Sequence, residues 1–321
     1  MRRREFLQHA AATAVVAGGS SFLPRSAFSA PPVLAEGEQV GPRPAFSVVP
    51  VVGDGKWIWK QPPADQTGYL EPRSFEVKVG MSLEGTGAAR GVTATTTVPV
   101  EHPEQKIEDL QIQTQGRSAA VRELEPGAGQ LRLSAAGIQA GQVVAAVATF
   151  RLTISKQYHG YEQAMFPQQQ EPTAEVRKRF LQNSPGIETS SREVRELAEK
   201  LTAGAPHPWD QAKRFAEWSA ENIRARLGTY TSVVAALRDR VGDCEERSAV
   251  FVAFCRAVGI PARLVWIPNH NWAEFYLEDE EGQGHWIPAH TACYSWFGWV
   301  GAHELVLRKG DRVYVPERQR Q

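Results

Sequence analysis

The sequence predicts an α+β protein in which a small all-β sandwich domain precedes a core of helices packed on an antiparallel sheet. Residues 73–157 contain several runs in which polar and apolar side chains alternate, a pattern typical of strands. After residue 167 the apolar positions recur with the period of a helix, and strand patterns return only after residue 261. Helices followed by antiparallel strands indicate an α+β unit.

The amino-terminal segment 1–29 has the composition of an export signal. Three arginines at positions 2–4 precede a weakly apolar run, and small residues near position 29 suit a cleavage site. Arg3-Arg4-Glu5-Phe6-Leu7 resembles the twin-arginine signal, which directs folded proteins out of the bacterial cytoplasm. We therefore expect a periplasmic or extracellular protein. Residues 30–72, rich in proline and glycine, are expected to form an exposed lead-in.

The all-β domain is expected to span residues 73–165. Its strand patterns cover residues 74–79, 92–100, 130–134 and 143–154, and glycine-rich turns separate them. Strands at this spacing favour a small β-sandwich. No cluster of catalytic side chains occurs among them, so a structural or substrate-presenting role is expected.

The second domain is expected to span residues 166–310, followed by a tail at 311–321. Helical patterns cover residues 175–182, a segment that begins near Ser190-Ser191-Arg192-Glu193, and a segment that begins at Pro208. A further, almost wholly apolar helix ends at Gly259, and Pro261 prevents its continuation.

The start of that last helix carries the first candidate catalytic residue. Asp243 and Glu246 have the spacing of a capping box, which makes Cys244 the first helical residue. The helix dipole places partial positive charge there, which favours a thiolate. Unpaired backbone N–H groups at the same place can hold the oxyanion of a tetrahedral intermediate.

A histidine suited to act as a base follows on the strands after the helix. Residues 262–267 read as a core strand, and the next strand projects His270, Trp272 and Glu274 from one face. The segment that begins at Trp286 returns antiparallel, and this brings His290 back near His270.

The motifs together resemble those of the transglutaminase-like superfamily of cysteine enzymes. They are Gly-Asp-Cys at 242–244, Gly-Ile-Pro-Ala-Arg at 259–263, His-x-Trp-x-Glu at 270–274 and Trp-x-Pro at 286–288. The resemblance covers roughly residues 190–295. It implies a papain-like core with Cys244 as nucleophile and His270 as general base, acting on peptide or glutamine-type amides of a protein or peptide substrate. It also implies an aspartate at position 290, where this chain has His290.

The exchange at position 290 leaves three hypotheses open. A neutral His290 can orient His270 but brings no negative charge, so the enzyme would work more slowly, by hydrolysis or by acyl transfer through a Cys244 thioester. A module without catalytic activity would instead use the groove to bind peptide or cell-wall material. As a third possibility, Cys244, His270 and His290 form a set of zinc-ligand types.

Composition excludes several other functions. The chain has 321 residues with 36 basic and 36 acidic side chains, so no excess positive charge is available for nucleic acid. No run of about 18 apolar residues occurs, so no integral membrane segment is expected after removal of the signal. No cofactor, metal or calcium loop is expected. The oligomeric state is left open.

Three cysteines are an odd number for a protein in an oxidising compartment. Cys255 lies about three helical turns from Cys244, which is too far for a disulfide, and is expected in the core. Cys293 lies in an aromatic loop, and its pairing with Cys244 is left open.

Overall fold

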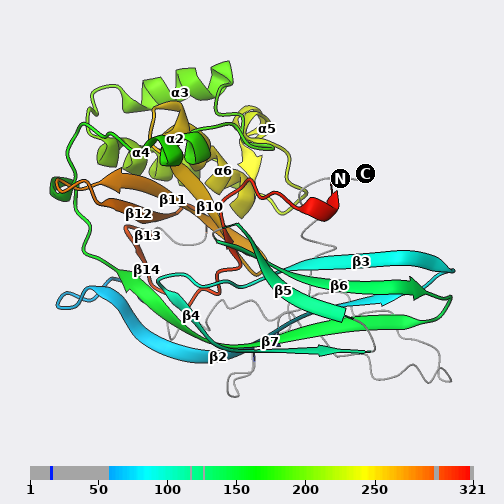
Figure 1. The fold of residues 1–321 in the computed structure, drawn as a ribbon. Helices are drawn as coiled ribbons and strands as arrows, with labels where there is room; N and C mark the ends of the chain where they lie inside the picture. Colours follow the sequence, from blue (N-terminus) through cyan, green and yellow to red (C-terminus); the bar gives the residue numbers. More distant parts are fainter. Residues whose placement is uncertain (1–14, 17–57, 116–117, 126, 293–295, 319–321) are drawn as a thin grey trace.

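The computed structural model describes residues 15–16, 58–115, 118–125, 127–292 and 296–318, and it confirms the predicted α+β class. Two layers of strands form a sandwich at one end, and at the other end helices cover one face of a sheet (Figure 1). Apart from β1 (Val15–Val16), which pairs with the next strand, the expected export signal lies outside the described residues. In the described part of the chain, no helix has the length and apolarity needed to cross a bilayer.

Within the described ranges, the sandwich contains six strands in addition to the two-residue β1. Val77, Leu131 and Phe150 are among the fully buried side chains of the core between its two layers. The strands are β2 (Gly68–Glu84), β3 (Ala89–Val98), β4 (Gln105–Thr114), β5 (Ser118–Glu125), β6 (Ala128–Ile138) and β7 (Val143–Tyr158).

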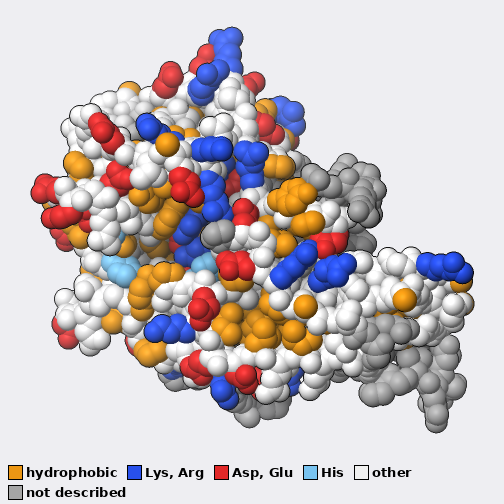
Figure 2. All heavy atoms as spheres, viewed as in Figure 1, with side chains coloured by type: hydrophobic (Ala, Val, Ile, Leu, Met, Phe, Trp, Pro, Cys, Tyr) orange, Lys and Arg blue, Asp and Glu red, His pale blue; other side chains and the backbone are white. Residues whose placement is uncertain are grey.

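Two of these strands, β4 and β5, were not predicted because their side chains are mostly polar. Each forms an edge of its sheet, with β4 paired only to β7 and β5 only to β6. An edge strand needs few buried side chains, so its apolar alternation is weak. The inward side chains Leu110 and Ile112 of β4 remain 38% and 36% exposed. Hydrophobic side chains gather on the surface over this sandwich (Figure 2).

The helices follow as predicted, with one addition. They are α2 (Ala174–Phe180), α3 (Arg192–Thr202), α4 (Pro208–Asn222), the additional α5 (Val233–Asp239) and α6 (Cys244–Ala257). The short strands β8 (Arg224–Ala225) and β9 (Val241–Gly242) pair in parallel just before α6. Cys255 is fully buried in α6, as predicted.

The sheet beneath the helices continues into the sandwich. Its antiparallel strands are β10 (Ala262–Ile267), β11 (His270–Glu278), β12 (Gly284–His290) and β13 (Trp296–Phe297). The two-residue strand β15 (Arg308–Lys309) joins β10 to β6, and β14 (Trp299–Val300) joins the other sheet at β7. The chain also forms single 3₁₀ turns at Gln163–Met165 and Pro316–Arg318. Strands this short carry no sequence period, so the connection was not predicted.

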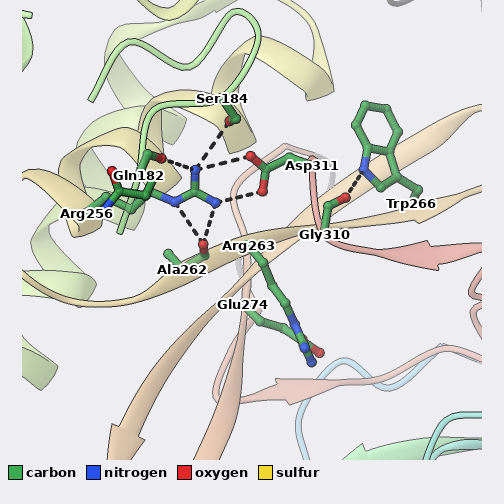
Figure 3. Close-up of polar contacts among 9 residues, drawn as sticks. All are labelled: Gln182, Ser184, Arg256, Ala262, Arg263, Trp266, Glu274, Gly310 and Asp311. Atoms are coloured by element: carbon green, nitrogen blue, oxygen red, sulfur yellow. Dashed lines mark hydrogen bonds and ion pairs between the residues drawn. The ribbon is translucent and has the colours of Figure 1, made fainter. Parts of the chain in front are cut away.

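A buried ion pair fixes α6 to the segment after β15 (Figure 3). Arg256 near the end of α6 makes two hydrogen bonds to the Asp311 carboxylate, at 2.6 and 3.1 Å. The same guanidinium donates to the carbonyl oxygens of Ala262 and Gln182. A planar guanidinium with this many partners holds one orientation. The helix that carries Cys244 is therefore held against the sheet from its far end.

Candidate active site

The amino terminus of α6 has the predicted capping box. Asp243 Oδ1 accepts from Glu245 N at 2.9 Å, and Glu246 Oε2 accepts from Asp243 N at 2.9 Å. Cys244 is half-buried and is the first residue of the helix. The Asp243 side chain also accepts from the backbone N–H of Glu246, so the cap uses two of the N–H groups expected for an oxyanion.

Arg247 places this helix start beside the end of β12. Its Nε donates to the carbonyl oxygen of Ile223 at 2.8 Å, and its Nη1 donates to that of Ala292 at 3.1 Å. Ala292 lies two residues after His290, and Arg247 lies three residues after Cys244. Because side chains three apart share a helix face, the Cys244 turn faces the segment after His290. No sequence motif pointed to Arg247.

His270 and His290 meet as the antiparallel return predicted. Their Nε2 atoms lie 3.0 Å apart, and the two rings are 4.9 Å apart between centroids. His270 begins β11 and His290 ends β12, so the pair spans two adjacent strands at one end. His290 is only 2% exposed, and its ring contacts Trp296 edge-on at 5.4 Å.

Burial decides the charge of this pair. Desolvation lowers the pKa of His270 to about 4, because the ring lies beside an apolar cluster that includes Ile267 and Trp272. His270 is therefore a neutral imidazole at pH 7. A hydrogen bond between two ring nitrogens requires one N–H and one lone pair. When Nε2 of His270 donates, Nδ1 keeps the lone pair that a base needs, and His290 must present an unprotonated Nε2.

The remaining motif residues form a separate buried cluster. Glu274 is 1% exposed, and its carboxylate contacts Arg263 at 2.6 Å and Lys309 at 2.7 Å. Burial opposes ionisation of Glu274, but the charges of Arg263 and Lys309 outweigh it and lower the pKa of the carboxyl. The Arg263 guanidinium also lies 3.8 Å above the Trp286 ring. Figure 3 shows Arg263 reaching Glu274 from the neighbouring strand. Glu274 thus holds strands together, as expected of a residue four positions from His270.

Lys309 belongs to this cluster although no sequence pattern indicated it. It lies on β15 and also pairs with Glu104 of the sandwich at 2.7 Å. One lysine therefore links β11 to the loop before β4. A lone lysine near the end of a chain carries no signal of burial, since most lysines are exposed.

The zinc hypothesis is not supported by the donor arrangement. Among the described residues, which include Cys244, His270 and His290, no three or more His, Cys, Asp or Glu side chains are grouped to hold a metal ion. The reason is geometric, because the Nε2 atoms of the two histidines point at each other. Cys293, whose pairing was left open, lies outside the described residues.

The buried histidines and Glu304 predict a maximum in stability near pH 6.5. His270 and His102 have pKa values of about 4 in the folded protein, so on acidification they bind protons in the unfolded chain before they do so in the folded one. Acidification from pH 6.5 to pH 4 therefore destabilises the fold. Burial raises the pKa of Glu304 to about 8, so stability falls as pH rises from 4.5 to 8. The free energy of unfolding, measured with urea, should fall by about 1–2 kcal/mol between pH 6.5 and pH 8. In a Glu304→Gln variant it should not fall over this range, and an equal fall in both proteins would contradict the prediction.

Comparison with known proteins agrees with this arrangement of motifs. The family model of the transglutaminase-like superfamily matches residues 195–291, which include Cys244, His270 and His290. A solved structure named "Putative Cysteine Protease", from Cytophaga hutchinsonii, superposes with a TM-score of 0.59 over 76% of this chain and 83% of that chain, at 15% identity. At that identity the likeness concerns the fold alone.

One curated relative is similar over a short stretch. Peptide-N(4)-(N-acetyl-beta-glucosaminyl)asparagine amidase of Yarrowia lipolytica is 30% identical over 76 residues. This stretch is 23% of the present chain and spans a fifth (20%) of the relative's length. The similarity therefore concerns one part of each protein.

Proposed function

We propose that this chain is an exported cysteine enzyme that acts on amide bonds of peptides or proteins through a thioester on Cys244. His270 is the general base, and His290 orients it. The observation that carries the proposal is the 3.0 Å contact between the two Nε2 atoms, beside a helix that begins at a cysteine. The transglutaminase-like match at residues 195–291 and the name of the curated relative, an amidase, support the same reaction class.

The proposed reaction begins with a neutral thiol and a neutral imidazole. The sulfur of Cys244 attacks the carbonyl carbon of the amide, and its proton passes to Nδ1 of His270. The negative oxygen of the tetrahedral intermediate faces the helix start, where the N–H of Cys244 is a candidate donor. The C–N bond then breaks, and the departing amine takes the proton from His270. Water or a second amine attacks the thioester and returns the thiol.

His290 limits this reaction in a way that an aspartate would not. When His270 holds the thiol proton it is positively charged, and a neutral His290 offers only a lone pair to its Nε2–H. Opposite charge nearby stabilises an imidazolium far more than a neutral acceptor does. The enzyme is expected to turn over slowly. The same exchange favours the second candidate function, a module without catalytic activity that binds peptide or cell-wall material.

The proposal includes export of the protein and its organisation into two domains. The twin-arginine pattern at residues 3–7 supports export to the periplasm or beyond. We propose a sandwich domain at 73–165 and a catalytic domain at 166–310, with the lead-in at 30–72 and the tail at 311–321. β2 begins inside the lead-in, at Gly68, and Asp311 of the tail is buried against Arg256 of the catalytic domain. Export is tested by measuring full-length precursor and processed protein in cell fractions, both for the wild type and for an Arg3→Lys/Arg4→Lys variant.

Alkylation of Cys244 separates the two candidate functions. With His270 taking the thiol proton as the sulfur attacks, iodoacetamide should label Cys244 between pH 5 and 7 faster than it does in His270→Ala, and labelling should fall near pH 4 as His270 protonates. Mass spectrometry locates the label, and Cys244→Ala and Cys293→Ser variants identify the reacting thiol. Cys255 is fully buried and should remain unlabelled. A rate that only rises near pH 8.5, as in His270→Ala, would favour the binding module.

A further inference from the structure

A short loop borders the helix start that carries Cys244. β8 pairs in parallel with β9, with Arg224 opposite Val241 and Ala225 opposite Gly242. The pairing ends at Gly242, two residues before Cys244 begins α6. The loop therefore leaves β8 beside the segment that leads into the helix start.

The loop is held at both ends. Arg226 N donates to the carbonyl oxygen of Gly242 at 2.9 Å, and Thr231 N donates to Glu246 Oε1 at 3.0 Å. Glu246 is the capping-box residue, so the loop crosses the same helical turn that presents Cys244. Tyr230 is buried, which anchors the returning arm. Residues 227–229 thus form a short loop tip between two segments that are bonded to the helix start.

The surface of this loop combines an apolar tip with positive charge. Leu227 is 91% exposed, the highest value for a large apolar side chain in the described part of the chain. Arg224 and Arg226 are exposed on the arm that leads to it. The Arg226 charge acts on Asp239, whose carboxylate is itself bonded to Arg238 at 2.7 and 3.0 Å. The arm therefore carries a net positive charge.

We propose that residues 226–231 form a substrate-contacting wall of the Cys244 site, and that Leu227 contacts a large apolar side chain of a peptide substrate. The inference rests on the proposed function. The apolar side chain belongs to the residue whose carbonyl reacts, since the two ends of the loop are bonded to Gly242 and Glu246, two residues on either side of Cys244. Acidic residues farther along the peptide meet Arg224 and Arg226. Contact with substrate would cover an apolar side chain that the protein itself leaves in water.

Two matched affinity labels test the inference on the full chain under reducing conditions. They are acetyl-Ala-Leu chloromethyl ketone and acetyl-Ala-Gly chloromethyl ketone. In each, the Cys244 sulfur forms a thioether and chloride leaves, so the labels differ only in the side chain beside the reacting carbon. The wild type should react about tenfold faster with the leucine label, the discrimination expected of a few methylene contacts. Leu227→Ser should bring the two rates close together, and Leu227→Met should keep the preference.

Controls separate this inference from the proposed function. The alkylation rate with iodoacetamide, which has no side chain to recognise, should be unchanged in Leu227→Ser, and this also shows that the variant is folded. Leu110→Ser, on an exposed strand of the sandwich, should keep the leucine preference. A preference that survives in Leu227→Ser, or is absent in the wild type, overturns the inference while rapid iodoacetamide labelling leaves the proposed function standing.

A binding measurement tests the inference in the case that the Cys244 thiol is unreactive. If iodoacetamide reacts slowly at every pH below 8, the proposed function fails. Fluorescence anisotropy with Cys244→Ala then compares a labelled Glu-Ala-Leu-Gly peptide with its Glu-Ala-Gly-Gly counterpart. If the leucine peptide binds more tightly than the glycine peptide, and this difference in affinity disappears when Leu227→Ser is added, the result supports the wall as a binding surface. Equal affinities overturn it.

Discussion

Replacing His290 by glutamate is expected to raise the rate of thioester formation on Cys244 by about 10- to 1,000-fold. A carboxylate within hydrogen-bonding distance raises a histidine pKa by about 1–3 units, and each unit is a factor of ten in stabilising the imidazolium. In a serine protease, exchanging the triad aspartate for asparagine lowers turnover about 10⁴-fold, so the opposite exchange should act in the opposite direction. The pKa of His270 should rise from about 4.

Glutamate is the preferred replacement because its side chain is long enough to contact His270. The present contact joins His290 Nε2 to His270 across 3.0 Å, and a glutamate extends about as far from the backbone as a histidine. His290→Asp, which restores the residue implied by the family resemblance, is shorter and should raise the rate less. Thioester formation is followed with an activated amide or ester substrate, and NMR titration follows His270. His290→Ala, which removes the acceptor, should be slower than wild type. A glutamate variant no faster than wild type would mean that another group orients His270.

Replacing Glu274 by alanine is expected to lower the free energy of unfolding by about 3–5 kcal/mol. The carboxylate lies 2.6 Å from Arg263 and 2.7 Å from Lys309, and all three side chains are largely buried. Removing it leaves Arg263 without that carboxylate and leaves Lys309 paired with Glu104. A buried charge that loses a partner keeps its desolvation cost, which is why the expected effect is large.

Urea unfolding followed by circular dichroism measures this change. The matched control is Glu76→Ala, because Glu76 pairs with Lys78 at 2.9 Å while both side chains are about half exposed. An exposed pair contributes about 0–1 kcal/mol, so this variant should be nearly as stable as wild type. A loss in Glu274→Ala no larger than that of the control would show that the cluster is not a buried charge network. Cys244 alkylation in the folded variant should remain close to wild type if Glu274 acts only on the fold.

The candidate site was predictable where it depends on neighbours in the sequence. A capping box fixes the first residue of a helix over four positions, which placed Cys244 correctly. An antiparallel return after a short turn places residues by strand geometry, which brought His290 to His270. Glu274 lies four residues along the strand from His270, roughly 13 Å at the rise of a strand, and this distance indicated a structural role.

Other parts of the molecule depend on segments far apart in the sequence. Lys309 reaches Glu274 only because the two-residue strand β15 enters the sheet between β10 and β6. Arg247 reaches Ala292 only because α6 lies on the sheet. The loop at residues 226–231 borders the start of α6 only because β8 pairs with β9 and Thr231 bonds to Glu246.

The sequence by itself determined the fold class, the helix that begins at Cys244 and the meeting of two histidines, because periodicity, caps and short returns are local and act over a few residues. Only the tertiary structure decided the charge of His270, the partners of Glu274 and the loop beside the start of α6. These depend on which distant side chains exclude water or supply charge at each point, and no local pattern encodes that.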